Sequence, residues 1–234
     1  MTVKTSTSRV EARTAWTTSG GAYQQVPLEF EKLSASIVAL SSGNADLRLN
    51  SAAIRMLLGD DNPSIQPAEL LPALLVHSLR QQIELSMQPG RTQVKDMSLE
   101  RPFGPNFCQI WGRVAGWLSE QGIEWRSHGW NFELSAQTGQ RTGGDLITGL
   151  LAQRARMPER PLTGGSLVLK YQLDTARVTL TVEPRFGEAD AHAVFASSNY
   201  HFQEPPPLSA DLADEVGRRL WGDFASACEN LFEE

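Results

Sequence analysis

The strongest constraint on the fold lies between residues 166 and 202, where three runs of alternating apolar and polar residues follow one another. The runs read SLVLKYQL, RVTLTVEPRF and HAVFASSNYHF, and the three residues between the first two are few enough for a tight hairpin. After the prolines at 205–207, apolar residues recur at helical spacing, at Leu212, Val216, Leu220, Phe224 and Leu231. A helix of this kind buries its apolar side on a sheet. The pattern therefore predicts an α+β fold, in which a C-terminal antiparallel sheet of three or more strands is covered by a long terminal helix.

The centre of the chain favours helix. Apolar residues run at helical spacing from Pro67 to about Met87, and Asn50 and Asn106 are suited to cap further helices. Residues 28–40 fit either a strand or a helix. We therefore expect a helical middle region beside the sheet, within a single α+β domain over residues 21–234, with a subdivision near residues 90–105 left open. No repeat with a period of 20–50 residues is visible.

The first 20 residues differ from the rest of the chain. They are rich in Thr, Ser and Val in rough alternation, have few side chains able to fill a core, and end at Gly20-Gly21. This composition is typical of an edge strand, or of an extended arm that becomes ordered on a partner.

Charge is unevenly distributed. The net charge is −6, and residues 204–234 supply all of it, with two arginines against eight acids. We interpret most of these acids as the solvated side of the last helix. The alternative is an acidic surface, including Asp223 and Glu229, that docks on a basic partner. The overall acidity argues against a dedicated binder of duplex DNA.

The remaining composition predicts a cytoplasmic protein with no membrane contact. No apolar leader or membrane-length apolar run is present, and the two cysteines, Cys108 and Cys228, do not suggest a disulfide framework.

Catalytic and metal-binding motifs are absent from the sequence, so we predict no metal and no cofactor. The best catalytic candidates are Glu183, Asp190 and His192, since Asp190 and His192 would share one side of a strand and Glu183 would lie on its neighbour. Such a polar cluster could serve a hydrolase. A helix N-terminus near Cys108 would lower the pKa of a thiol, but a small buried residue beside Trp111 is the simpler interpretation.

The stretch TGQRTGGDLITGLLAQ, residues 138–153, resembles a phosphate loop only in its glycines. It lacks the lysine of a Walker loop and the glycine order of a dinucleotide site, and Asp145 would itself occupy the free amides at the helix start. We interpret it as a turn followed by a capped helix. Arg141, Arg154, Arg156 and Arg160 could still bind nucleic acid or another anion.

Four of the six tryptophans fall within residues 111–130. Such a cluster is most often core, although exposed rings can anchor a partner or stack on the bases of a single strand. Our candidate residues for a partner interface are Trp16, Trp111, Trp125, Trp130, Asp223 and Glu229.

Three functional hypotheses follow. The first is a non-catalytic interaction or assembly subunit of an intracellular, bacterial protein complex, whose partners are other protein chains. The second is a protein that binds nucleic acid, such as a single strand, or a nucleotide through the arginines of 141–160. The third and weakest is the hydrolase.

Overall fold

One antiparallel sheet of nine strands organises the chain. A computed structural model describes residues 28–42, 50–67, 74–139, 141–155, 165–185 and 191–232, and the predicted arm at 1–20 lies outside them. The strands run in the order β2-β3-β4-β5-β1-β6-β9-β8-β7. They are β1 (Phe30–Ser42), β2 (Ser64–Pro67), β3 (Leu74–Ser78), β4 (Ile83–Gln88), β5 (Arg91–Asp96), β6 (Glu124–Gln137), β7 (Leu167–Leu173), β8 (Ala176–Pro184) and β9 (Ala193–Phe202).

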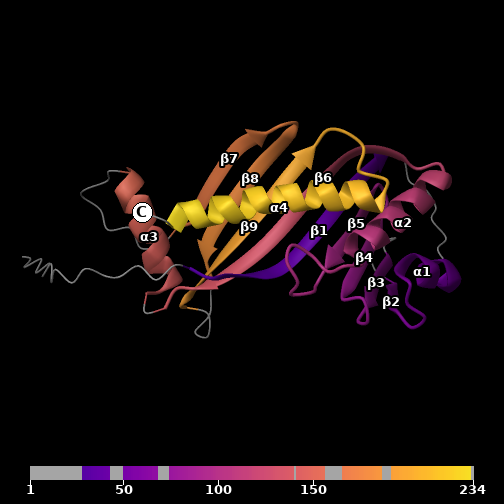
Figure 1. Ribbon diagram of the computed structural model, residues 1–234, viewed down its shortest axis with the longest axis horizontal. Helices are drawn as coiled ribbons and strands as arrows, with labels where there is room; N and C mark the ends of the chain where they lie inside the picture. Colours follow the sequence, from indigo (N-terminus) through magenta and orange to yellow (C-terminus); the bar gives the residue numbers. More distant parts are fainter. Residues whose placement is uncertain are drawn as a thin grey trace, which may run out of the picture.

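Helices cover one face of this sheet. They are α1 (Ser51–Leu58), α2 (Phe107–Glu120), α3 (Gly143–Ala155) and α4 (Ala210–Phe232). The long α4 crosses in front of the strands, from α2 at one end of the sheet to α3 at the other (Figure 1). No helix in the described part of the chain is both long and apolar enough to cross a membrane.

The core lies between α2, α4 and the central strands. Trp130 and Phe132 of β6 project toward α4, where the ring of Phe132 lies 6.1 Å from that of Phe224 and 5.6 Å from that of Trp221. Trp111 of α2 is fully buried as well, and its indole nitrogen donates to the carbonyl of Pro207, 2.7 Å away. The aromatic cluster therefore joins both helices to the middle of the sheet.

The second face of the sheet is polar. Side chains that point away from the helices are mostly serine, threonine, asparagine and charged residues, as expected for an antiparallel sheet with one solvated face. At its centre, Asn199 of β9 donates to Asn131 of β6 at 2.6 Å, and Asn131 donates to Ser36 of β1 at 3.2 Å. Hydrogen-bonded side chains thus link the three central strands on this face.

The expected fold class is wrong in its helical middle region. The segment predicted as a helix from Pro67 to Met87 contains the end of β2 and then β3 and β4, and more of the described residues lie in strands than in helices. The physical reason is that the same apolar residues also alternate. Val76, Leu85 and Met87 point to the core at period two, and Gln82, with φ 52°, turns the chain between β3 and β4. The ambiguous residues 28–40 belong mainly to β1, at the centre of the sheet.

The three C-terminal strands and the terminal helix are found where the sequence pattern predicts them. Strands β7, β8 and β9 form a meander, and the side chain of Ser209 accepts a hydrogen bond from the Leu212 amide at the start of α4. The predicted cap at Asn50 is confirmed by its bond from the Ala53 amide at 2.8 Å. In the stretch 138–153, Thr142 caps α3, since it accepts from the Asp145 amide and donates to the Asp145 carboxylate.

The order of elements repeats. In the described parts of residues 30–120 the order is a strand, a helix, four strands and a helix, and in those of residues 124–232 it is a strand, a helix, three strands and a helix. Counted outward from the centre, the sheet reads β1-β5-β4-β3-β2 on one side and β6-β9-β8-β7 on the other. The two halves are therefore topological counterparts that meet at the antiparallel pair β1 and β6, and β2 has no counterpart among the described residues.

Helix α4 offers a matched pair of glycines for a test of the core. A Cβ atom added at Gly217 would lie 2.6 Å from Cζ3 of Trp130 and 2.8 Å from Cε1 of Phe103, whereas one added at Gly222 would meet nothing within 4 Å. We expect Gly217→Ala to lower the free energy of unfolding by about 1–3 kcal/mol through overpacking. Gly222→Ala should raise it by up to about 1 kcal/mol, because alanine favours helix. Denaturant unfolding measures both, and equal effects of the two substitutions would contradict this packing.

Candidate functional site

Three large apolar side chains face solvent at one end of the sheet. Leu79 is 89% exposed, Leu99 78% and Met97 49%. Leu79 lies in the loop between β3 and β4, and Met97 and Leu99 lie in the loop that follows β5. We call these three side chains the apolar tip.

Backbone hydrogen bonds join the two loops of the apolar tip. The amide of Met97 donates to the carbonyl of Gln82 at 2.8 Å, and the amide of Gln82 donates to the carbonyl of Leu79 at 3.4 Å. The loops therefore lie side by side, as expected for loops at one end of neighbouring strands.

A buried carboxylate fixes the first loop. Asp60, which follows α1, accepts a hydrogen bond from the hydroxyl of Ser78 and one from the amide of Asn62 at 3.0 Å. Ser78 in turn accepts from the amide of Gln81 at 3.1 Å, inside the loop. The bond from Ser78 is the main reason why the pKa of Asp60 lies below its ordinary value. The loop that carries Leu79 is thus fixed by the hydrogen bonds of Ser78 and Gln81, while Leu79 itself is exposed.

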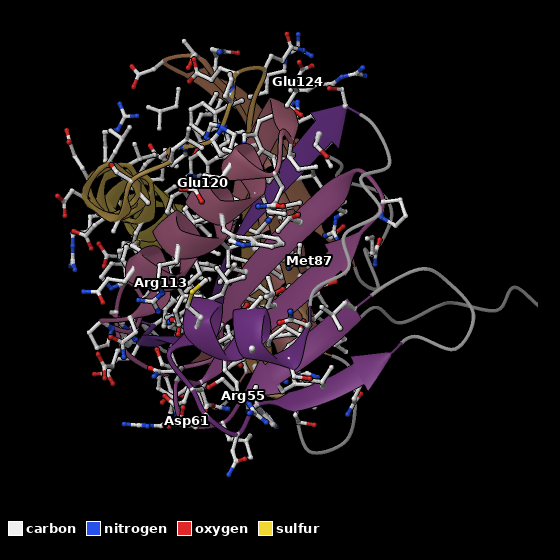
Figure 2. All side chains as sticks on the ribbon, turned by 90° about the vertical axis from the view of Figure 1, so that its right-hand side faces the viewer. Arg55, Asp61, Met87, Arg113, Glu120 and Glu124 are labelled. Carbon is white, nitrogen blue, oxygen red and sulfur yellow. The ribbon has the colours of Figure 1, made fainter. Side chains whose placement is uncertain are left out.

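Helices α1 and α2 support the same loop. The side-chain amide of Gln81 donates to the carbonyl of Gly59 at 3.2 Å, and Asn106 donates to Gln81 at 2.7 Å. Because Asn106 is engaged with Gln81, its side chain makes no capping bond to α2, and the cap predicted there is wrong. Figure 2, which faces the right-hand side of Figure 1, shows α1 beside α2, and Arg113 of α2 donates to the Leu57 carbonyl at 2.8 Å.

A buried ion pair fixes the second loop. Lys32 of β1 and Asp96 of β5 form a salt bridge with both side chains fully inaccessible to solvent. Lys32 also donates to the carbonyls of Ser98 and Glu100, each at 2.9 Å, and Asp96 accepts from the Gly104 amide at 3.0 Å. Burial lowers the pKa of Lys32, and its hydrogen bond to Asp96 offsets part of that shift. The pair holds the loop so that Ser98 points inward and Met97 and Leu99 point outward.

The apolar tip and the residues around it have the composition of a surface that contacts other proteins. Exposed polar side chains surround the apolar tip, at Arg80, Gln82, Glu100 and Arg101. An apolar centre with a polar rim is the usual anatomy of a protein interface. Both loops are held by buried bonds, so little conformational entropy would be lost when a partner binds.

The three catalytic candidates are not brought together by the described contacts. Nδ1 of His192 lies 3.0 Å from the carbonyl of Arg141, and Glu183 lies on β8 opposite Phe195. Asp190 lies outside the described residues. Cys108 is buried, which raises the pKa of its thiol to about 12 and makes it a poor nucleophile. In the described ranges, no group of three or more His, Cys, Asp or Glu residues is placed to hold a metal ion.

Of the four arginines, only Arg141 can be located in full. It is exposed in the turn before α3, where its carbonyl accepts from the hydroxyl of Thr138. Arg154 lies in α3, but its side chain is outside the described part, as are Arg156 and Arg160 entirely. Their convergence stays a prediction.

The predicted interface residues are dispersed. Trp111 and Trp130 are fully buried, Trp125 is half-buried with its indole nitrogen 3.0 Å from the Ser119 hydroxyl, and Glu229 is exposed on α4. Trp16 lies outside the described residues.

Asp223 holds helix α4 to the sheet. It accepts hydrogen bonds from Tyr171 of β7 at 2.7 Å and from Tyr200 of β9 at 2.6 Å. Burial, with Asp223 as the next cause, raises the pKa of Tyr171 to about 12. Asp223 is therefore engaged within the fold.

The apolar tip is not predicted from the sequence, because the helix expected over residues 67–87 has Leu79 on its apolar side. The available signal was local. Leu79 and Leu99 each stand between polar neighbours, in SLRQ and SLER, outside any stretch that alternates cleanly. A single exposed leucine is common, so it is the adjacency of the two loops that indicates a functional role for these residues.

Removal of one partner of the buried ion pair should strongly lower the free energy of unfolding. We expect Asp96→Ala to lower the free energy of unfolding by about 3–5 kcal/mol, because it leaves the Lys32 ammonium buried without a counter-charge. The control is Lys95→Ala, one residue away, whose pair with Glu133 at 3.4 Å is partly exposed and should contribute about 1 kcal/mol or less. Similar losses in the two variants, measured by denaturant unfolding, would refute the role given to Lys32 and Asp96.

The bond between Ser78 and Asp60 should make stability depend on acid pH. A carboxyl whose pKa is lowered by folding stabilises the fold above its ordinary value of 3.8, and this stabilisation is lost as pH falls through the lowered pKa. We therefore expect the difference in the free energy of unfolding between wild type and Ser78→Ala to shrink as pH falls below 3.8. Denaturant unfolding at a series of pH values measures it. Ser86→Ala, on the polar face of β4, should show no such trend, and a constant difference for Ser78→Ala would be the contrary result.

No family model matches the chain, and no curated protein matches it either.

Proposed function

We propose that this protein is a non-catalytic interaction or assembly subunit, and that it contacts another protein chain through the apolar tip. The observation that carries the proposal is the exposure of Leu79, Leu99 and Met97 on two joined loops. Large apolar side chains exposed on adjoining loops and flanked by polar residues are typical of protein contact sites.

The support beneath the tip adds to the argument. Exposed leucines on an unsupported loop would be drawn back onto the protein, or would move freely. Here the neighbours of Leu79 are fixed by Asp60 and Ser78, and those of Leu99 by Lys32. Because these loops are already fixed, little conformational entropy is lost on association, and this favours binding of a partner.

The partner expected for this surface is a folded protein with an apolar depression. The three side chains project from the end of a sheet, so they suit insertion into a concave site. Affinity would come from desolvation of their apolar surface, with the charged neighbours Arg80 and Glu100 setting orientation.

The test is a comparison of complexes formed in the source cells. We expect wild-type protein to elute as part of a high-mass assembly in native extracts, and Leu79→Ser together with Leu99→Ser to abolish that assembly, measured by size-exclusion chromatography with light scattering. Both side chains are exposed, so the unfolding midpoint should be nearly unchanged.

The matched control is Leu212→Ser. Leu212 is 48% exposed on α4 and belongs to neither loop of the tip. This variant should assemble as wild type does. A monomeric wild-type protein in native extracts, or normal assembly by the double variant, would rule out the proposed function.

A further inference from the structure

Residues 203–209 connect the last strand, β9, to helix α4, and we call them the connecting segment. The segment contains three consecutive prolines, at 205–207, of which Pro206 and Pro207 are buried. A proline has no amide hydrogen, so this part of the segment cannot be fixed by its own backbone donors. Its attachment to the fold depends on donors that reach its carbonyl groups.

Two aromatic side chains supply such donors. Trp111 of α2 donates its indole N–H to the carbonyl of Pro207 at 2.7 Å. Nδ1 of His128, on β6, lies 2.9 Å from the carbonyl of Glu204. Because a carbonyl oxygen only accepts, Nδ1 carries the hydrogen in this pair. The connecting segment is thus bonded to the sheet near its beginning and to α2 near its end.

His128 is enclosed by the fold. It is 4% exposed, and its ring stacks on that of Phe202, with the centroids 4.6 Å apart and the planes 3° from parallel. Phe202 is its partner on β9 and is buried as well. A neutral imidazole can make the bond to Glu204 in this position. A second proton would place a positive charge on a ring that water hardly reaches, which is unfavourable.

The charges around the ring do not compensate for its burial. Burial is the largest influence, and it lowers the pKa of His128 below the ordinary value of 6.5. Glu204, in the connecting segment, raises the pKa through its carbonyl and its carboxylate, and His201 of β9 lowers it. On β1, the residue opposite His128 is Ala39, which carries no charge. The ring is therefore neutral at neutral pH.

We propose that His128 is an acid-sensitive switch that holds the connecting segment closed while it is neutral and releases it when it takes up a second proton. In the open state the ring lies in water, where its charge is solvated. The first turn of α4, which follows the segment directly, opens with it.

The packing of α4 explains why the opening reaches this first turn. Ala210 lies so close to α2 that a Cβ added at Gly112 would be 2.9 Å from the Ala210 amide nitrogen. The amide of Ala213 donates to the carbonyl of Ser209 at 3.1 Å, so the end of the segment is part of the helix. Release of the segment would also expose Trp111, which is fully buried in the closed state. Acid would thereby uncover apolar surface on α2.

This switch is separate from the apolar tip. Ala39 pairs with His128 on one side and with Thr92, near the start of β5, on the other. Met97 and Leu99 of the tip follow the opposite end of β5. Failure of either proposal would therefore leave the other unaffected.

The sign of the pH dependence follows from the two states. The open state has the ordinary pKa of 6.5, and the closed state has a lower one. The closed state is fully favoured above pH 6.5, and it loses stability as pH falls from 6.5 through the lowered pKa. Within this window one extra proton is bound on opening, so the opening equilibrium constant rises by up to about tenfold per pH unit.

Amide hydrogen exchange in the full chain, between about pH 7 and pH 5, tests the switch. Each observed rate is divided by the intrinsic rate at the same pH, which gives the opening constant. We expect the constant for the Ala213 amide to rise by up to about tenfold per pH unit in wild type. The amide of Ala53, bonded to Asn50 in α1 at 2.8 Å, is the internal control and should show no such rise.

Two variants assign the effect to one side chain. His128→Asn keeps an N–H donor near the position of Nδ1 but binds no proton in this pH range. Its opening constant for Ala213 should be independent of pH, at a higher value than in wild type, because the smaller side chain leaves a space beside Phe202. His201→Asn, on the other face of β9, is the matched control and should keep the wild-type trend.

Three results would overturn the proposal. One is an opening constant for Ala213 that does not change with pH in wild type. Another is the wild-type rise in His128→Asn. The third is an equal rise at Ala53, which would mean that the whole molecule unfolds. If His128→Asn does not fold, NMR titration of the His128 ring in wild type decides the matter, since uptake of the second proton at pH 6.5 or above would refute the switch.

Discussion

The buried pair of Lys32 and Asp96 is the interaction on which most of this structure depends. It joins β1, at the centre of the sheet, to β5, and its spare hydrogen-bonding groups are used by the loop that leaves β5. That loop contains Phe103, which contacts Trp130 and lies where a side chain at Gly217 would have to be. A pair of charges in the interior is expensive unless every polar group around it is used, and here the loop supplies the needed partners. The same bonds therefore fix the direction of the loop, the position of α4 against Phe103 and the exposure of Met97 and Leu99.

The repeated order of elements explains why a sheet of nine strands can be covered by few helices. Each half places its last helix, α2 or α4, over its own strands, and the two helices pack together where Gly112 approaches Ala210. A Cβ at Gly112 would lie 2.9 Å from the Ala210 amide nitrogen, so the close approach requires glycine. The small polar side chains on the opposite face, such as Ser36 and Asn131, can be satisfied by each other and by water, and that face needs no second layer.

The sequence allowed correct prediction of the parts in which one periodicity dominates. The last three strands, α4 and the cap at Asn50 belong to this group, because clean alternation, helical spacing and capping side chains are local signals. The middle of the chain was mispredicted because its apolar residues also fit helical spacing, whereas Val76, Leu85 and Met87 point to the core at period two in β3 and β4, which pair with each other. The repeat was invisible because it lies in topology, with no residue pattern to mark it.

The candidate site was less predictable than the fold. Tryptophans are prominent in the sequence, but Trp111 and Trp130 fill the core, and the exposed apolar residues are ordinary leucines and a methionine. Their position depends on buried bonds between residues far apart, such as Lys32 with Glu100, and on the side-by-side placement of two loops. No local pattern encodes either of these.

The shared carboxylate of Asp223 has a further consequence for how the protein opens. An edge strand ordinarily frays on its own, since only one neighbour holds it. Tyr171 of β7 and Tyr200 of β9 both donate to Asp223, which belongs to the helix that seals the core. Detachment of β7 must therefore break a bond to α4 as well as the pairing with β8. The hydroxyl of Tyr171 stays protonated throughout the physiological range, because its pKa is raised to about 12. The outermost strand thus belongs to the same cooperative unit as the centre of the molecule.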